Sequence, residues 1–439
     1  MSPHADAPSA GWPMARVAWR TVMVLTLVYA IAFVHRIGLG LLVEPLQKDL
    51  HFSDTAIGWL AGMMFALPYT LGGPLFGWLA DRRSRRSIIA IAAAGWSATT
   101  AAFGLLTSFA ALAATRFAAG LTQAALQPAA SSMIADCFEA RDRARAYGVY
   151  VAGTSVGTAV AFWLGAVAIA IGDLLAGVTD IKDWSAAFLV LAALGLVAPL
   201  SMLFIGEPVR REQGGAASAT VYATIGFLRR EWLVIGCLSL GVAICFLAPY
   251  GQLAFMPVMF SRKYGWSAAE LAMVYGTIGV LSGGLGSILG GWISARLAHR
   301  GRADGDWIIC LAGSAGSLVA GGIAPLMPTG ESSLFFFAIS ALFTNWPSVG
   351  ALGVVNRLAR NEMRGQLTAI YTSAAGLIGA GLGPVVVGTL SDRLPGAWGG
   401  VSAAMSITFF GCAFLSCILL AVGQQPFRRF IAGHGTISR

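Results

Sequence analysis

Charged side chains are scarce in this sequence. Asp, Glu, Lys and Arg make up 11% of its 439 residues, whereas a water-soluble domain carries about 25%. So few charges cannot cover a water-facing surface, which excludes a soluble enzyme, a nucleic-acid-binding domain and a disordered chain. Hydrophobic residues make up 57%, and the mean hydropathy is +0.73. The composition predicts a membrane protein that crosses the bilayer many times.

Several chemical motifs are also missing. The sequence has no phosphate-binding Gly-rich loop ending in Gly-Lys-Ser/Thr, so nothing indicates an ATP-driven pump. None of its six cysteines forms a Cys-x-x-Cys pair, which argues against a disulfide framework or a zinc site. The first apolar run lacks the small-residue cleavage site of a signal peptide. We expect no catalytic residue, no cofactor, no metal and no nucleic-acid partner.

Long apolar runs fill most of the chain. A membrane-spanning helix needs about 20 such residues, and two sets of six runs reach that length. The runs cover residues 19–42, 54–80, 87–107, 109–135, 147–171, 185–206, 232–260, 268–295, 306–327, 331–355, 365–390 and 401–423.

A polar stretch separates the two sets of runs. We therefore expect an all-α membrane protein with twelve transmembrane helices in two six-helix bundles. The bundles are predicted at 1–206 and 232–439, with a cytoplasmic linker at 207–231. A shift of 214 residues places Gly77-Trp78 on Gly291-Trp292 and Arg82 on Arg296. Parallel six-helix repeats are typical of one class of transporter, whose substrate site lies near the middle of the membrane between the halves.

Basic residues are distributed unevenly over the loops. Cytoplasmic loops of membrane proteins are enriched in Lys and Arg. With the N-terminus placed in the cytoplasm, few of the 29 basic side chains lie on the other side, namely Lys48, Lys182, Arg262, Lys263 and Arg393. We therefore expect both termini in the cytoplasm and a multi-pass protein of the plasma membrane, here a bacterial inner membrane.

One loop resembles a family signature. The stretch from Gly77 through Asp81 and Arg82 to Arg86 is similar to the signature loop of the major facilitator superfamily, except that Ser84 stands where glycine is usual. Five other stretches resemble its spinster-like branch, which is related to the anion:cation symporters: 66–70, 95–97, 116–124, 128–136 and 207–208. The resemblance implies a transporter that works by alternating access.

Two positions depart from that branch. Its members typically have an Asp-Arg pair in the first helix, where this chain has His35-Arg36. They typically have Glu in the fourth helix, where this chain has Gln123. The family links these acids to proton coupling, so inherited proton symport is in doubt. His35 is the one histidine in an apolar run, and it is either a proton carrier or a helix-packing residue.

Two arginines lie inside apolar runs without a nearby acid. Arg36 precedes Glu44 by eight residues, about 12 Å along a helix, and Arg116 lies at a similar expected depth in the fourth run. Charge in the membrane is costly and usually functional, and the guanidinium fork matches carboxylate and phosphate. We predict that Arg36 and Arg116 bind an anion. The alternative is that one of them bonds backbone carbonyls or extends toward the interface.

Neutral polar and aromatic residues complete the predicted site. Gln123 and Gln127 share a helical face with Arg116, Tyr29 shares one with Arg36, and the repeat places Tyr250 opposite Arg36. The second half supplies no charge in the middle of its runs, but it does supply Gln252, Asn345 and Tyr371. The alternative for each neutral residue is ordinary helix packing.

The signature loop is predicted to be a gate. Its residues are Gly77, Asp81, Arg82, Arg85 and Arg86. Asp81 is expected near the N-terminus of the helix starting at about Gly365, where the helix dipole favours an anion. Arg85 or Arg86 is expected to pair with Asp136. The alternative is that the basic residues only set orientation.

The sequence therefore predicts a monomeric secondary transporter of an organic anion or anionic amphiphile, with the lipid bilayer as its other partner. An exporter of neutral or cationic amphiphiles is the runner-up. A transporter-like sensor that binds ligand without moving it is the alternative from another class.

Overall fold

The computed structural model describes residues 13–176, 181–211, 221–359, 361–394 and 399–434. Within these ranges the chain consists of helices and contains no strand. Twelve spans are long and apolar enough to cross a membrane. The predicted all-α fold with twelve transmembrane helices is confirmed.

The first half contributes six spans, three of which are interrupted. They are α1 (Ala15–Leu41), α3–α4 (Asp54–Ala61 and Met63–Ala80), α5 (Arg85–Leu105), α6–α7 (Phe109–Gln123 and Leu126–Cys137), α8 (Ala140–Ala176) and α9–α10 (Asp183–Gly195 and Val197–Ser201), which continues into η1 (Met202–Phe204). A short helix, α2 (Val43–Leu50), lies between the first two spans.

The second half repeats this plan. Its spans are α12 (Trp232–Tyr264), α13 (Ala268–His299), α14 (Gly305–Ile323) with η2 (Ala324–Leu326), α15–α16 (Gly330–Thr344 and Trp346–Leu358), α17 (Asn361–Ala374) with the π-helix η3 (Ala375–Leu382) and α18 (Gly383–Arg393), and α19 (Val401–His434). Helix α11 (Val221–Arg230) lies within the expected linker, of which residues 212–220 fall outside the described ranges. The domain boundaries stay a prediction.

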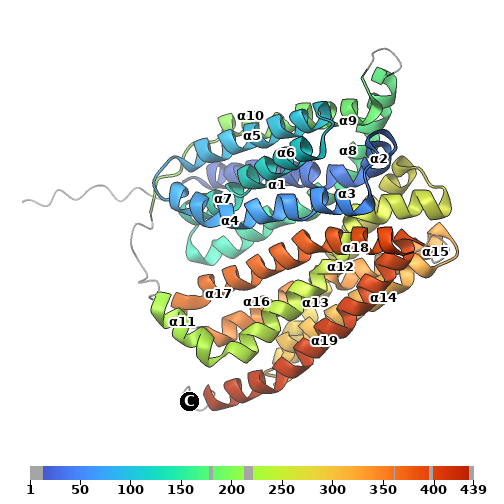
Figure 1. Ribbon diagram of the computed structural model, residues 1–439. Coiled ribbons are helices and arrows are strands. Elements are labelled where there is room, and N and C mark those ends of the chain that lie inside the picture. The colour runs from blue at the N-terminus through green and yellow to red at the C-terminus, as the bar shows by residue number, and fades with distance from the viewer. Residues whose placement is uncertain (1–12, 177–180, 212–220, 360, 395–398, 435–439) are drawn as a thin grey trace, which may run out of the picture.

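The two halves form two layers that run side by side (Figure 1). At one end of the bundle lie α11 and the C-terminal end of α19, at the left of Figure 1; this end also carries the basic loop 81–84, and we call it the basic end. At the other end lie α2 and the start of α15, at the right of the figure, and we call it the distal end.

The main helix contacts between the two halves are α1 with α12, α3 with α18, α4 with η3, and α8 with α13. The contact of α3 and the following Gly62 with η3 and α18 is so close that it requires glycine. A Cβ atom on Gly58 would lie 2.5 Å from the carbonyl oxygen of Pro384, and one on Gly62 would lie 2.2 Å from that of Gly381. Absence of a side chain thus allows the two backbones to touch. Gly62 also separates α3 from α4.

Candidate functional site

Arg36 is held on α1 by aromatic rings. Its guanidinium carbon lies 4.6 Å from the ring centroid of Phe65, 4.8 Å from that of Tyr69 and 5.6 Å from that of Phe33. In the part of the chain that the structure describes, no carboxylate forms an ion pair with Arg36. Aromatic faces attract a cation without neutralising it, so the charge of Arg36 stays available to an anion.

A small cavity of about 40 Å³ borders Arg36 between the two halves. Its wall includes Phe65 from the first half and Tyr250, Ala380 and Pro384 from the second. The repeat predicted that Tyr250 lies opposite Arg36, and the structure brings both to this cavity. Their role in binding remains a prediction.

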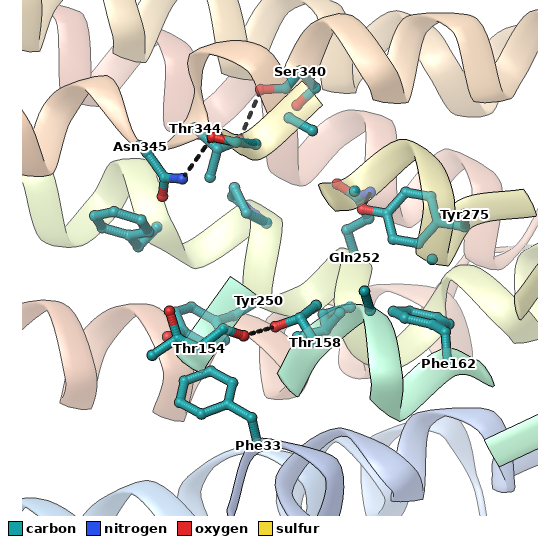
Figure 2. Close-up of a pocket in the computed structure, with 18 residues that line it drawn as sticks. Phe33, Thr154, Thr158, Phe162, Tyr250, Gln252, Tyr275, Ser340, Thr344 and Asn345 are labelled. Atoms are coloured by element: carbon teal, nitrogen blue, oxygen red, sulfur yellow. Dashed lines mark hydrogen bonds between the residues drawn. The ribbon is translucent and has the colours of Figure 1, made fainter. Parts of the chain in front are cut away.

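A second cavity, of about 280 Å³, adjoins the first, and we call it the chamber. The two cavities share Phe33, Tyr250 and Leu253 in their walls. Figure 2 shows polar side chains pointing into the chamber from both halves of the molecule. They are Thr154 and Thr158 of α8, Tyr250 and Gln252 of α12, Tyr275 of α13, Ser340 and Thr344 of α15, and Asn345.

Arg116 lies behind the Arg36 cavity and lines neither space. It is 6% exposed, and its guanidinium carbon lies 5.2 Å from the centroid of the same Phe65 ring that contacts Arg36. Its Nε donates to the carbonyl oxygen of Leu60 at 3.0 Å, beside the break between α3 and α4. Its Nη2 has no partner among the described residues. This geometry fits the carbonyl-bonding alternative for Arg116, while substrate binding by Arg116 remains a prediction.

His35 points into the first half and away from both cavities. Its Nδ1 lies 2.8 Å from Thr100 Oγ1, which itself donates to the carbonyl oxygen of Trp96. Both contacts are hydrogen bonds when His35 Nδ1 is the donor, and in that tautomer Nε2 carries the lone pair. A Cβ atom on Gly195 would lie 2.4 Å from that Nε2. The environment is a tight helix contact, and a proton-carrying role remains untested.

The other predicted residues divide into two groups. Tyr250 and Asn345 line the chamber. Tyr29, Gln123, Gln127 and Tyr371 do not line either cavity: Tyr29 stacks on Tyr150 at 4.7 Å between ring centroids, Gln123 and Tyr371 are buried, and Gln127 is exposed.

Residues 25–384 match the family model described as Major Facilitator Superfamily. The chain belongs to this superfamily. An MFS-type efflux pump of Mycolicibacterium smegmatis is 30% identical over 86% of both chains. Protein spinster of Drosophila melanogaster is 26% identical over 89% of this chain and 65% of its own length. The D-galactonate transporter of Escherichia coli O6:H1 is 24% identical over 88% of this chain and 92% of its own.

Among solved structures, the fold resembles a bacterial homolog of the human lysosomal transporter Spinster in an inward-facing, unoccupied conformation. The TM-score is 0.81 with 23% identity, over 94% of this chain and 98% of that one. Superfamily and fold together show that this chain is a multi-pass membrane transporter and not an enzyme. The resemblance to the spinster-like branch is confirmed.

The superfamily signature loop takes part in a charged cluster at the basic end. Arg85 is 1% exposed and pairs with Asp136. This is one of the two pairings that the sequence predicted. Its Nε also donates to Glu207 at 2.8 Å. Arg86 does not pair with Asp136; its Nε donates to the carbonyl oxygen of Met202 at 2.9 Å. We call Arg85, Asp136 and Glu207 the basic-end cluster, and all three belong to the first half or its edge.

Asp81 is exposed in this conformation. Its carbonyl oxygen accepts from Arg210, while the side chain of Arg82 lies 4.4 Å from the Trp78 ring and donates to the Trp78 carbonyl oxygen. The helix expected to begin at about Gly365 begins at Asn361. Among the described residues, no contact is found between Asp81 and that helix. The predicted gating contact of Asp81 would therefore form in another conformation.

Sequence reasoning missed a second charged cluster, at the distal end, which joins the two halves. The Asp54 carboxylate is 5% exposed and accepts from Arg262 at 2.8 and 3.0 Å, from Gln47 at 2.8 Å and from Ser391 at 2.6 Å. The Asp392 carboxylate accepts the backbone N–H groups of Asp54 and Thr55, at the start of α3. We call Gln47, Asp54, Arg262, Ser391 and Asp392 the distal cluster. It links the two halves at this end of the molecule.

The chamber threonines were missed for a different reason. Thr154 and Thr158 lie on α8 next to Gly153 and Gly157, which pack against α1, and a threonine beside such glycines is compatible with helix packing. The sequence contains one indication of this wall of the chamber. Thr154, Thr158 and Phe162 are spaced by four residues and so share one helix face, and all three line the chamber.

Proposed function

We propose that this transporter carries an organic anion or anionic amphiphile across the membrane by alternating access, with Arg36 binding the anionic group between the two halves. The supporting observation is that the guanidinium of Arg36 lines a cavity between the two halves and has no acidic partner among the described residues. A cation inside the membrane without a counterion is costly, and an incoming carboxylate or phosphate supplies the missing partner.

The relatives support this class of cargo. The similar Escherichia coli protein is named a D-galactonate transporter, and galactonate is an organic anion. The similar mycobacterial protein is named an efflux pump, which favours the runner-up, export of neutral or cationic amphiphiles. The charge of Arg36 disfavours a cationic cargo at the same place.

The two ends of the molecule are proposed to be its gates. In this conformation the distal cluster joins the halves, so cargo exchange through the distal end requires these bonds to break. We place the basic end in the cytoplasm, because it carries most of the arginines, and the protein in a bacterial inner membrane as a monomer.

Coupling is the part of the proposal that departs most from the family. Glutamine at position 123 carries no proton, and His35 is packed against Thr100 and Gly195 away from both cavities. We therefore propose anion exchange or facilitated diffusion, indifferent to an imposed proton gradient. Accumulation driven by a pH gradient in proteoliposomes, and lost in His35→Gln, would show instead that His35 carries a proton.

The function is tested in two steps. Purified protein is screened by thermal shift against organic acids, phosphates, lysolipids and cationic amphiphiles; a ligand at 100 times its Kd stabilises by about 2.7 kcal/mol. Hits are then assayed for counterflow in proteoliposomes. Stabilisation by anions with counterflow supports the proposal. Stabilisation by cationic amphiphiles alone supports the runner-up, and binding without counterflow supports a sensor.

A further inference from the structure

The wall of the chamber combines polar groups with apolar side chains such as Phe33, Phe246 and Leu253. Eight of the residues that line it carry a hydroxyl or amide group, and they come from both halves of the molecule (Figure 2). Among the described residues of its wall there is no charged side chain. A space of this kind takes a neutral part of a ligand, while Arg36 in the adjoining cavity takes the charge.

The threonine hydroxyls of the chamber are left as acceptors. Thr158 Oγ1 donates to the carbonyl oxygen of Thr154 at 2.8 Å, and Thr154 Oγ1 donates to that of Val151 at 2.9 Å. Thr344 Oγ1 donates to the carbonyl oxygen of Ser340 at 2.8 Å, and Ser317 Oγ at 2.9 Å uses one of its two lone pairs. A hydroxyl has one hydrogen and two lone pairs. Because each hydrogen is bonded to the protein's own backbone, the lone pairs are what a ligand meets.

The two amide side chains of the chamber also leave acceptors, and not donors, for a ligand. Gln252 Nε2 donates to the Tyr275 hydroxyl oxygen at 3.1 Å and to Met256 Sδ at 3.5 Å. Asn345 Nδ2 donates to Ser287 Oγ at 3.0 Å and to the carbonyl oxygen of Gly283 at 3.5 Å. Their carbonyl oxygens are acceptors, and the remaining donors are the hydroxyl hydrogens of Tyr250 and Tyr275. The chamber therefore offers more acceptors than donors, and it matches a ligand that brings hydrogens of its own.

We propose that the chamber binds the body of the cargo through several hydroxyl groups, which makes the cargo a small hydroxylated organic acid and not a long-chain amphiphile. This inference rests on the proposed function, because Arg36 supplies the anion site. Methylene groups placed against these acceptors leave them unpaired. A site built to bond ligand hydroxyls rejects the analogue that lacks them far more strongly than an apolar site does.

The size of the chamber points the same way. At about 280 Å³ it lies just below the range of about 300–1,000 Å³ that is usual for drug-sized ligands. A compact six-carbon body fits such a space, whereas an extended acyl chain continues beyond it.

The test compares six-carbon acids that carry hydroxyls with a six-carbon acid that has none and with a long-chain anionic amphiphile. Binding to the full-length protein in detergent is measured calorimetrically for a set of six-carbon hydroxy acids (D-gluconate, D-galactonate and D-glucuronate), for hexanoate, and for 16-carbon lysophosphatidic acid. We expect at least one hydroxy acid to bind about tenfold or more tighter than hexanoate and than lysophosphatidic acid.

Two variants locate the preference. The double variant Thr154→Val and Thr158→Val keeps shape and removes the hydroxyls, so it should reduce the preference for the hydroxy acid over hexanoate to about threefold or less. Thr122→Val is the matched control, since Thr122 also donates to its own helix but packs on Gly95 outside the chamber. It should leave the preference unchanged.

The outcomes separate the two proposals. If hexanoate or lysophosphatidic acid binds as tightly as every hydroxy acid, and Arg36→Ala abolishes that binding, this inference is wrong and the proposed function stands. If no hydroxy acid binds, or if the double variant keeps the full preference, this inference is also wrong. If Arg36→Ala leaves the affinity of every acid unchanged, the proposed function itself fails.

Discussion

The two halves tie their third and fourth spans together at the basic end with ion pairs of opposite polarity. In the first half the cation, Arg85, begins the third span and the anion, Asp136, ends the fourth. In the second half the anion, Asp306, begins the third span and the cation, Arg357, ends the fourth, with 2.7 Å between Arg357 Nε and Asp306 Oδ2. The repeat thus keeps the link and reverses its charges.

Burial distinguishes the two pairs. The side chains of Arg85 and Asp136 are 1% and 6% exposed, whereas those of Arg357 and Asp306 are 37% and 10% exposed. Breaking a buried pair leaves an unpaired charge away from water, but water can solvate a partly exposed partner. The same link should therefore be much more sensitive to mutation in the first half.

A second contrast separates the ends of the molecule. At the basic end each of these pairs stays within one half, while at the distal end Asp54 of the first half is bonded to Arg262 and Ser391 of the second. A bond between halves must break when the halves separate, whereas a bond within a half can persist. We infer that the distal cluster controls the conformational equilibrium and that the basic-end pairs maintain the shape of each half.

The largest effect is expected for Arg85→Ala. It leaves Asp136 buried without its partner, and breaking such a pair costs about 3–5 kcal/mol. Thermal unfolding in detergent should show a marked loss of stability. Arg82→Ala, an exposed neighbour on the same loop, is the control and should unfold like the wild type. Equal stability of the two variants would contradict the buried-pair account.

A smaller effect, on conformation instead of stability, is expected for Arg262→Ala. Loss of about 1.4 kcal/mol from the distal cluster shifts the balance of states about tenfold. Spin labels are attached at Lys48→Cys in the first half and Arg393→Cys in the second, in a variant without the six native cysteines. In Arg262→Ala, the distance between the two labels should be long in a larger share of molecules than without this substitution. Lys263→Ala is the control, because Lys263 bonds Pro325 and Met327 within its own half. An unchanged distance distribution in Arg262→Ala would show that the distal cluster does not hold the halves together.

Asp306→Asn should have a smaller effect than Arg85→Ala. Arg357 is exposed enough for water to replace the lost charge, so we expect a loss of about 1 kcal/mol or less in thermal unfolding. A loss as large as that of Arg85→Ala would mean that burial does not distinguish the two halves.

The smallest effect concerns pH. Burial alone would raise the pKa of Glu207, but hydrogen bonds from the Arg86 backbone and from Arg85 and Ser84 hold it below its ordinary value of 4.5. A carboxylate with a lowered pKa stabilises the fold above that ordinary value, and the contribution is lost as pH falls through the lowered pKa. The stability advantage of the wild type over Glu207→Gln should be full at pH 7 and should shrink below 4.5. If the stability advantage of the wild type over Glu207→Gln grows as the pH falls, the predicted direction of the pH dependence is wrong.

The sequence predicted the parts of this structure that depend on local pattern. Twelve spans follow from the apolar runs, and the opposition of Arg36 and Tyr250 follows from the repeat. The distal cluster could not be predicted, because Asp54 and Ser391 are 337 positions apart and nothing in either neighbourhood indicates the other. The apolar runs placed His35 and Arg116 in the membrane, but a run does not specify whether a helix face meets the cavity or a neighbouring helix.

The most direct measurement of the central claim is anion affinity at Arg36. An anion identified in the thermal-shift screen is titrated calorimetrically into wild type, Arg36→Ala and Arg36→Lys, with Arg82→Ala as the control. We expect Arg36→Ala to lose at least about 100-fold in affinity, since one partner of a buried charge pair is removed. Arg36→Lys should recover only part of it, since the bidentate fork is lost. Affinity of the alanine variant equal to that of the wild type would contradict the account.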